Sequence, residues 1–194
     1  MADLTRRELD DPRAMRALAH PLRLRLLTLL TREGTLTSTR AAELTGESTG
    51  SCSFHLRQLA KYGYVEPAPG GRGRERPWKP VIADLRWSAV QPDAEGEAAA
   101  TELVRQMVNR DLADLREHMS RGDSEPPEWR DAAQLSSGLL FLTREELEEF
   151  GEDYLALVNR YADRIDDPRL RPAGSRPVRR LAFAVPLADS EQLP

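Results

Sequence analysis

Along its first 62 residues the chain carries apolar positions at helical spacing, separated by short polar breaks. Residues 21–33, PLRLRLLTLLTRE, present leucines around most of a helix, which is typical of the central helix of a small bundle. An earlier helix is predicted from Pro12 to about Leu18, because Asp11 is a favourable N-cap and proline suits the first helical position. This part of the chain is therefore expected to form a small helical bundle.

The clearest two-faced pattern runs from Ser48, which is expected to cap a helix, to Tyr62. Cys52, Leu56 and Leu59 recur at i, i+4 and i+7 and predict one apolar stripe for a core. The rest of the surface carries no carboxylate and consists of Thr49, Ser51, Ser53, Phe54, Arg57, Gln58 and Lys61. At about 1.5 Å per residue this helix would be roughly 22 Å long, which suits a DNA major groove.

A short helix is expected just before this stretch. Thr37 is its N-cap, Leu36 fits a very short strand ahead of it, and Gly46 suits the tight turn that follows. Two short helices joined by a glycine-containing turn form the helix-turn-helix arrangement, whose second helix enters the groove. The helix over 48–62 is therefore predicted to read DNA.

After Tyr62 the pattern changes from helical to hairpin-like. We expect a strand near 64–67, a glycine-rich tip at 70–73 and a returning strand around 76–79, with prolines confining both strands to an edge. The arginines that crowd this hairpin are Arg72, Arg74 and Arg76. Such a basic wing is placed to meet phosphates or a minor groove.

The second half begins with a long helix, expected over about 94–121. It carries a repeating apolar stripe made of Leu103, Met107, Leu112, Leu115 and Met119. Nothing in the first 90 residues obviously requires this stripe, so a helix of a second subunit is predicted to cover it.

The last third is predicted to form a strand-helix-strand unit. The apolar runs 136–142 and 178–187 fit buried strands. Between them, Thr143 and Glu146 form a capping box for a helix that reaches to about Ile165. The fold class is therefore mostly α with a small β component. We divide it into a winged helix-turn-helix domain over 1–90 and a dimerisation and sensing region over 91–194.

Composition narrows the class of protein. No apolar run approaches the roughly 18 residues of a membrane helix, and the N-terminus lacks a signal-peptide core, so a soluble cytoplasmic protein is expected. A single cysteine excludes an intrachain disulfide and a Cys-rich zinc site. The net charge of −4 divides into +5 for residues 1–80 and −9 for 81–194. A basic first part and an acidic second part are typical of a nucleic-acid module joined to a partner or sensor module.

The segment from about Met15 to Pro80 resembles the arsenic-repressor (ArsR) family of winged-helix bacterial regulators. The resemblance rests on LAHPLRLRLLTLL at 18–30, AAELTGES at 41–48 and CSFHLRQLAKYGYVE at 52–66. It covers roughly a third of the chain. It implies a dimer on an inverted-repeat operator, usually acting as a repressor, with the helix after the wing completing the dimer interface.

Two departures from that family concern the signal. Metal-sensing members carry Cys-x-Cys in the first helix of the motif, where this chain has the sequence RAAE at 40–43. Other members use Asp/His pairs in the helix after the wing, and the nearest approach here is Asp111, Asp114 and His118. We therefore predict no metal and no cofactor. The expected input is an apolar small molecule or a physical stimulus such as heat, to which some extended relatives respond.

The predicted DNA contacts divide by role. Arg57, Ser53 and Phe54 are expected at base edges, while Ser48, Lys61 and the wing arginines hold the backbone. His55 is expected to pack or to contact a phosphate, and Cys52 to be a core residue. The full predicted set is Thr37, Ser38, Arg40, Ser48, Thr49, Ser51, Ser53, Phe54, His55, Arg57, Gln58, Lys61, Arg72, Arg74 and Arg76.

The leading interpretation is a homodimeric, stress- or heat-responsive transcriptional repressor that binds an inverted-repeat operator in double-stranded DNA. Alternatives are a protein-interaction adaptor that uses the winged helix, and a metal-responsive repressor. An enzyme is not expected, because the chain has no nucleophile elbow, phosphate loop or metalloprotease motif and only three dispersed histidines.

Overall fold

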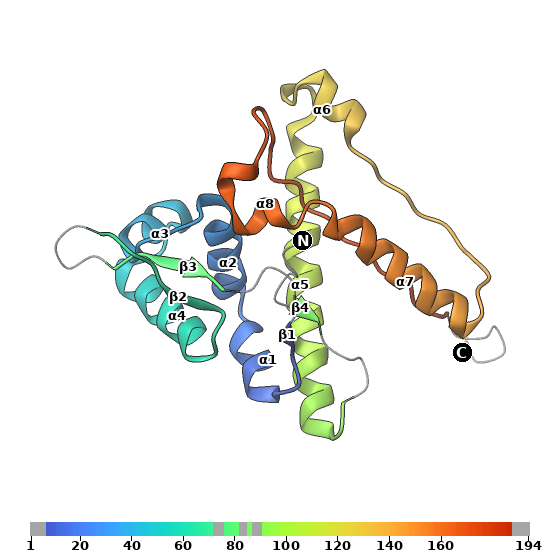
Figure 1. Ribbon diagram of the computed structural model, residues 1–194, viewed down its shortest axis with the longest axis horizontal. Helices are drawn as coiled ribbons and strands as arrows, with labels where there is room; N and C mark the ends of the chain where they lie inside the picture. The colour runs from blue at the N-terminus through green and yellow to red at the C-terminus, as the bar shows by residue number, and fades with distance from the viewer. Residues whose placement is uncertain (1–6, 72–75, 82–84, 87–90, 188–194) are drawn as a thin grey trace.

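The computed structural model describes residues 7–71, 76–81, 85–86 and 91–187. Its α-helices are α1 (Pro12–Leu18), α2 (Pro21–Glu33), α3 (Ser38–Thr45), α4 (Thr49–Lys61), α5 (Ala94–Arg121), α6 (Pro127–Ala132), α7 (Arg144–Asn159) and α8 (Asp163–Asp166). Short 3-10 turns follow α5 and α8, namely η1 (Gly122–Ser124) and η2 (Pro168–Leu170). Figure 1 shows α1 to α4 on one side of the long α5 and α7 on the other. No helix among the described residues is long and apolar enough to span a membrane.

Two small sheets accompany the helices. Strands β2 (Val65–Pro67) and β3 (Trp78–Pro80) form the expected antiparallel hairpin, and Leu36 bridges to Trp78 at its edge. The short strand predicted at Leu36 is therefore confirmed. Strands β1 (Arg7–Glu8) and β4 (Leu85–Arg86) pair in parallel, a contact that the sequence pattern did not predict.

Local capping residues set the helix boundaries, and Asp11 is one that the sequence predicted. The Asp11 carboxylate accepts from the Arg13 amide at 2.8 Å and starts α1. The Leu22 amide donates to Nδ1 of His20 at 3.2 Å, so the His20 imidazole itself caps α2. Gly34 ends α2 with φ of 78°, a conformation that side chains with a Cβ rarely adopt.

One hydrophobic core joins the first four helices to α5. The leucines of α2 pack with Met15 and Leu18 of α1, with the apolar stripe of α4, and with the completely buried Tyr64. The Tyr64 hydroxyl donates to the Ala14 carbonyl at 2.8 Å, which ties the exit of α4 to α1. Ala99, Ala100 and Leu103 of α5 belong to the same core, so the core extends past residue 90.

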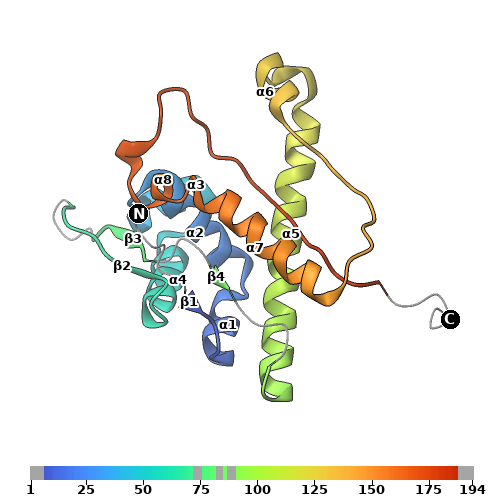
Figure 2. The ribbon, with the colours of Figure 1, turned by 45° about the vertical axis from the view of Figure 1, so that its right-hand side comes forward.

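The interpretation of the α5 stripe was wrong at its first position. Leu103 is completely buried within this chain, because the first half of α5 packs against α1 (Figure 2). It has no surface left for a second subunit. Met107 also packs on the core, Leu112 and Leu115 are half-buried, and Met119 is 64% exposed. Beyond Leu103, α5 therefore keeps available apolar surface at Val104, which is 41% exposed, and along its second half.

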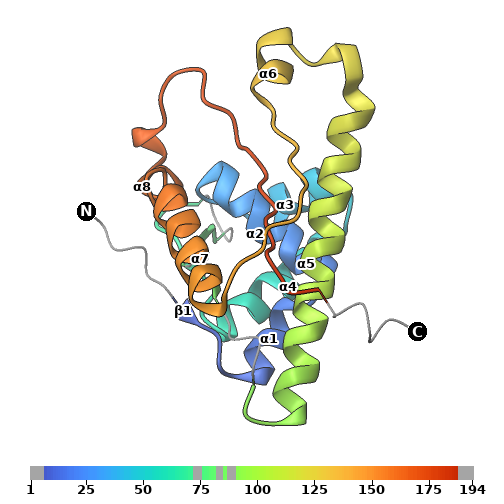
Figure 3. The same cartoon turned by 90° about the vertical axis from the view of Figure 1, so that its right-hand side faces the viewer.

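The predicted strand-helix-strand unit was also wrong. The capping box at Thr143 and Glu146 is confirmed, but α7 ends at Asn159 and a turn separates it from α8. Residues 136–142 and 178–187 form no strand, and Figure 3 shows them as extended chain. Phe141 is 98% exposed and Phe183 79% exposed. An apolar run forms a β-strand only when a partner strand satisfies its backbone hydrogen bonds. These two runs are extended but do not pair with each other.

Arginines attach this C-terminal region to the rest of the fold. Arg171 donates to the carbonyls of Thr31 at 2.8 Å and Arg32 at 2.9 Å, at the end of α2. Arg179 donates to Asp114 of α5 at 2.7 Å and to the Thr28 hydroxyl of α2 at 3.1 Å. These polar contacts bring residues from the end of the described chain onto α2 and α5.

Candidate nucleic-acid interface

The α3–turn–α4 unit is held by local caps. The Thr37 hydroxyl accepts from the Arg40 amide at 3.1 Å, and the Ser48 hydroxyl accepts from the Ser51 amide at 3.1 Å. Between them, Gly46 adopts a left-handed conformation with φ of 77°. Both predicted N-caps and the predicted turn glycine are therefore confirmed.

A contact that sequence reasoning missed fixes α3 to α2. The Arg25 guanidinium donates to the carbonyls of Leu44 and Thr45, each at 3.1 Å, and so occupies acceptors at the end of α3. The sequence shows only that Arg25 is a basic residue within α2. It does not indicate which carbonyls the Arg25 side chain reaches.

The two-faced character of α4 is confirmed. Cys52, Leu56 and Leu59 are all completely buried, and the Thr45 hydroxyl lies 3.6 Å from the Cys52 sulfur. Phe54 and Lys61 lie on the opposite, outward side, and Phe54 is 50% exposed. Phe54 therefore places an aromatic ring on the side of α4 that faces away from the core.

One flank of α4 turns back toward α2. The His55 ring lies 4.4 Å from the His20 ring, centroid to centroid, and 5.2 Å from the Phe54 ring. Burial lowers the pKa of both imidazoles below its ordinary value, and the charge of nearby Arg23 lowers each further. His55 therefore packs against the start of α2, which is one of the two roles expected for it. Ser51 and Gln58, half-buried, occupy the same flank.

The other flank of α4 faces α3 and the wing. Thr49, Ser53 and Arg57 repeat at i, i+4 and i+8 on this side. Together with residues of α3 and the wing they border an open recess of ≈ 420 Å³, which we call the α3–α4 recess. Its lining is Thr37, Ser38, Thr39, Thr49, Ser53, Arg57, Arg76 and Trp78.

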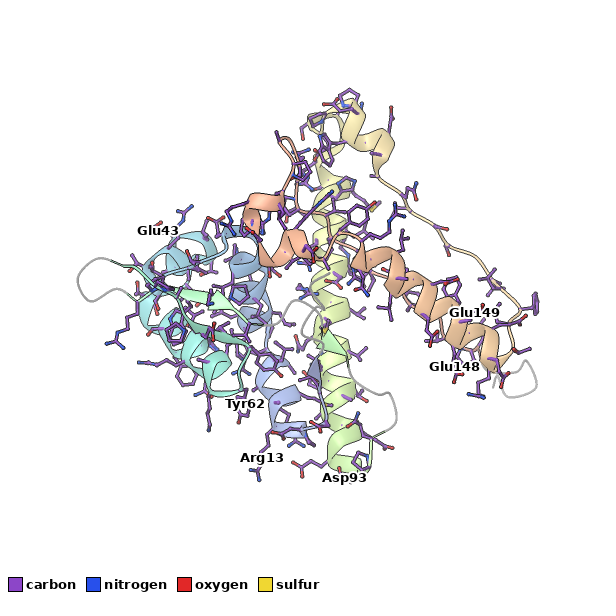
Figure 4. The ribbon with its side chains drawn as sticks, in the orientation of Figure 1. Arg13, Glu43, Tyr62, Asp93, Glu148 and Glu149 are labelled. Carbon is purple, nitrogen blue, oxygen red and sulfur yellow. The ribbon has the colours of Figure 1, made fainter. Side chains whose placement is uncertain are left out.

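The structure thus divides the predicted contact residues. Six of them border the α3–α4 recess, and two further lining residues, Thr39 and Trp78, were not predicted. Arg40 lies outside it and pairs with Glu43 at 2.8 Å, and Figure 4 labels Glu43 on α3. Arg72 and Arg74 lie outside the described residues.

Residues 18–67 match the family model described as a helix-turn-helix domain. The chain contains a helix-turn-helix domain. No curated protein matches the chain. The match covers about a quarter of the sequence, so the finer resemblance to the ArsR family stays a prediction.

The solved structures to which the chain is similar include transcription regulators, all at low identity and low TM-score. A transcriptional regulator homologue from Pyrococcus horikoshii OT3 is 17% identical, over 50% of this chain and 85% of its own, with a TM-score of 0.30. A mutant ZitR of Lactococcus lactis is 15% identical, over 74% and 83% of the two chains, with a TM-score of 0.33. A mutant MarR of E. coli with operator DNA is 18% identical, over 75% and 84%, with a TM-score of 0.30. Identities and TM-scores this low support no inference about the role of this chain.

The three residues that come nearest to a metal site in the sequence are Asp111, Asp114 and His118, and each lies beside an arginine. Asp111 pairs with Arg110 at 2.7 Å, and Arg179 reaches both Asp111 and Asp114. His118 lies beside Arg121. In the part of the chain that the structure describes, no group of three or more His, Cys, Asp or Glu side chains is arranged to hold a metal ion.

Proposed function

We propose that this chain is a transcription regulator that binds double-stranded DNA sequence-specifically through α4 and the wing. The observation that carries the proposal is the helix-turn-helix domain itself, in which α4 buries its whole apolar stripe and presents a carboxylate-free outer surface. A helix fixed in this way offers donors and one aromatic ring to a groove without the flexibility of a loop.

The charge distribution supports a nucleic-acid partner on this side of the molecule. The first 80 residues carry a net +5 and the remainder −9. Acidic residues of α7, such as Glu148 and Glu149, lie on the side of α5 away from α4 (Figure 4). A polyanion is therefore attracted to the α4 side and repelled from the α7 side, which orients the encounter.

We further propose a homodimeric repressor acting at an inverted repeat. Support comes from apolar side chains that this single chain leaves exposed, including Val104 and Met119 on α5 and Phe150 and Leu157 on α7. Exposed apolar area on this scale is typical of an interaction surface. A two-fold dimer would place two copies of α4 about 34 Å apart, one turn of B-DNA.

The input signal belongs to the C-terminal region in this proposal. The extended segments 136–142 and 178–187 expose leucine, phenylalanine and valine side chains that a small apolar ligand could cover. Heat is the alternative stimulus, because this region is attached mainly by exposed polar contacts. For heat, operator affinity must collapse reversibly over a narrow temperature range without added ligand; for a ligand, the affinity changes only on its addition.

The test is a fluorescence-anisotropy titration of the purified chain with its own upstream DNA and with random duplex of equal length. We expect specific affinity at least 10³-fold above non-specific affinity, falling steeply with salt. Arg160→Ala is a suitable control variant, because Arg160 is exposed beyond α7 and its side chain has no hydrogen-bond or ion-pair partner within the described chain. Equal affinity for both duplexes would contradict the proposal.

A further inference from the structure

We propose that the α3–α4 recess binds one phosphate group of the DNA backbone, and that Arg57 contacts this phosphate and not a base edge. The inference rests on the proposed DNA-binding function and assigns a specific ligand to a specific part of the interface. From their positions on α4 alone, Arg57 and Ser53 were expected to contact base edges. The proposal assigns them to the DNA backbone instead.

Positive charge in the recess is available for a ligand. Arg57 comes from α4 and Arg76 from the residue pair just before β3, and both side chains are exposed. Within the described residues neither donates to a carboxylate or a carbonyl. Other arginines of the same unit are already engaged, since Arg40 pairs with Glu43 and Arg25 binds the end of α3.

Backbone and hydroxyl donors add to these two cations. Thr37 to Thr39 form the start of α3, and Thr49 is the first residue of α4. The first amides of a helix have no acceptor within it, and the helix dipole places positive potential at that end. Two helix starts therefore contribute to a recess that already holds two guanidinium groups, and anions bind at such positions.

The chemistry of the lining selects a ligand that accepts hydrogen bonds. Among its described lining residues the recess has no carboxylate and no side-chain amide, and their polar side-chain groups are guanidinium, hydroxyl and the Trp78 indole N–H. Base edges in the major groove present both donors and acceptors, whereas the non-bridging oxygens of a phosphodiester only accept. A lining without strong acceptors therefore fits a phosphate better than a base.

Position in the fold favours a phosphate that belongs to a polymer. Thr39, Thr49, Arg57 and Arg76 are exposed, so the recess opens at the surface. It lies beside the outward side of α4, where Phe54 and Lys61 project. DNA that met those two residues in its major groove would carry its backbone along the groove edge, toward the recess.

The test uses a set of operator duplexes, each with a single methylphosphonate that removes the charge of one phosphate. Wild-type protein should lose on the order of tenfold in affinity at one position in each half-site, because a charge-assisted hydrogen bond is lost there. Arg57→Ala should lose a similar amount on unmodified DNA and be insensitive to that substitution. Its salt slope should fall by about 1.

Two further variants make the assignment sharp. Arg57→Lys keeps a point charge but loses the guanidinium fork, so it should retain part of the affinity if the partner is a phosphate. Lys61→Ala removes a cation from the same helix outside the recess, and it should stay sensitive to the same methylphosphonate. Thermal melting monitored by circular dichroism establishes that each variant is folded.

A second measurement separates the DNA backbone from a free phosphate. Inorganic phosphate is titrated against the protein at constant ionic strength, with Trp78 fluorescence as the signal in a Trp87→Phe, Trp129→Phe background. Saturable phosphate binding without any methylphosphonate coupling would overturn the DNA assignment. So would an Arg57→Ala loss that varies with base sequence and couples to no phosphate. Absence of duplex binding altogether would instead refute the proposed function.

Discussion

At the scale of single residues, the contact between the His20 and His55 rings connects proton binding to the position of α4. His20 caps α2 through Nδ1, which accepts from the Leu22 amide and so must be unprotonated. Burial is the main reason that the pKa of each imidazole is lowered. For His55 the neighbouring His20 and Arg23 lower it further, and Glu47 opposes them.

These shifts predict that the protein loses stability as the medium becomes acidic. A histidine whose folded pKa is depressed stays neutral in the folded state, while the unfolded chain takes up a proton near the ordinary pKa of about 6.5. Full stability is therefore present above that pH, and it falls as the pH decreases toward the folded pKa values. The free energy of unfolding, measured by urea denaturation between pH 5 and 8, should decrease below pH 6.5.

The variant that tests this pair is His55→Phe, which keeps a ring against His20 and removes one titrating group. The same pH series should show a shallower decrease for His55→Phe than for the wild type. An equal decrease in both would assign the pH dependence to other groups. Gln134→Glu, on an exposed segment, serves as the control variant. Asn159→Asp does not, because Asn159 carries a buried, unpaired side-chain oxygen.

A second residue-scale prediction concerns Tyr64. Its hydroxyl, completely buried, donates to the Ala14 carbonyl at 2.8 Å. Tyr64→Phe keeps the ring and leaves that carbonyl without this donor, so the free energy of unfolding should fall by about 1 kcal/mol. Tyr161→Phe, at an exposed position, provides the comparison. An unchanged urea midpoint for Tyr64→Phe would contradict the importance of this hydrogen bond.

Residue-scale prediction from the sequence succeeded where one residue decides one local event. Asp11, Thr37, Ser48 and Thr143 are N-caps as expected, because the hydrogen bond of a cap is closed within three residues. Which side of α4 meets which neighbour depends on contacts far along the chain. Arg57 was expected at a base edge from its position on α4, and that role stays a prediction; its place at the border of the α3–α4 recess depends on α3 and the wing, which the α4 pattern does not contain.

At the scale of elements, the C-terminal region is attached to the helix-turn-helix domain by polar contacts more than by a core. Of the residues after α5, Ala162 is the buried apolar one within the described part of the chain. Regions with little buried apolar area open with less free energy than the core. The amides of α7 and α8 should therefore exchange hydrogen faster than those of α2 and α4 in native-state exchange measured by mass spectrometry.

Arg171 is the residue of this attachment that can be tested most cleanly. It donates to two carbonyls at the end of α2 and to the Arg164 carbonyl at 2.8 Å. Arg171→Ala should accelerate exchange in α8 by several-fold and leave the α4 amides unchanged. Arg169→Ala is the matched control, since Arg169 is exposed and binds only Asp167 of its own turn. Equal acceleration of α8 exchange in Arg171→Ala and Arg169→Ala would argue against a specific role for Arg171.

Element-scale prediction failed in the same region for a physical reason. The runs 136–142 and 178–187 have the apolar composition of strands, but composition does not supply a partner for their backbone. The helix α7 was predicted correctly at its start, where a capping box is local, and incorrectly at its end. No glycine or proline lies between Asn159 and Ala162 to indicate that end.

At the scale of the whole molecule, the charge division was predictable and the shared core was not. Charges can be counted along a sequence, and Glu148 and Glu149 do lie away from α4. The apolar stripe of α5 was correctly recognised, but periodicity alone does not state what covers it. Ala99, Ala100 and Leu103 belong to the core shared with the first four helices, and the apolar surface of α5 left for another chain lies after Leu103.

This distribution gives the dimer proposal a sharp test at Met119. The side chain lies near the end of α5 and is 64% exposed, so replacing it changes little inside one chain. Met119→Glu keeps a good helix former and adds a charge that would be buried in a two-fold interface, at a cost of several kcal/mol. Sedimentation equilibrium should therefore show a dimer for the wild type and a much weaker association for Met119→Glu.

Coupling to DNA makes the same variant informative about the operator. A dimer that places two copies of α4 on one inverted repeat loses affinity for the full repeat when it dissociates, while each half-site is bound as before. The affinity of Met119→Glu for the full-repeat duplex should consequently fall to its affinity for a half-site duplex. Thr101→Glu adds the same charge at an exposed position in the first half of α5 and should behave as the wild type. If Met119→Glu and Thr101→Glu weakened association equally, general acidity and not the later part of α5 would govern self-association, and the two-fold contact would have to lie elsewhere.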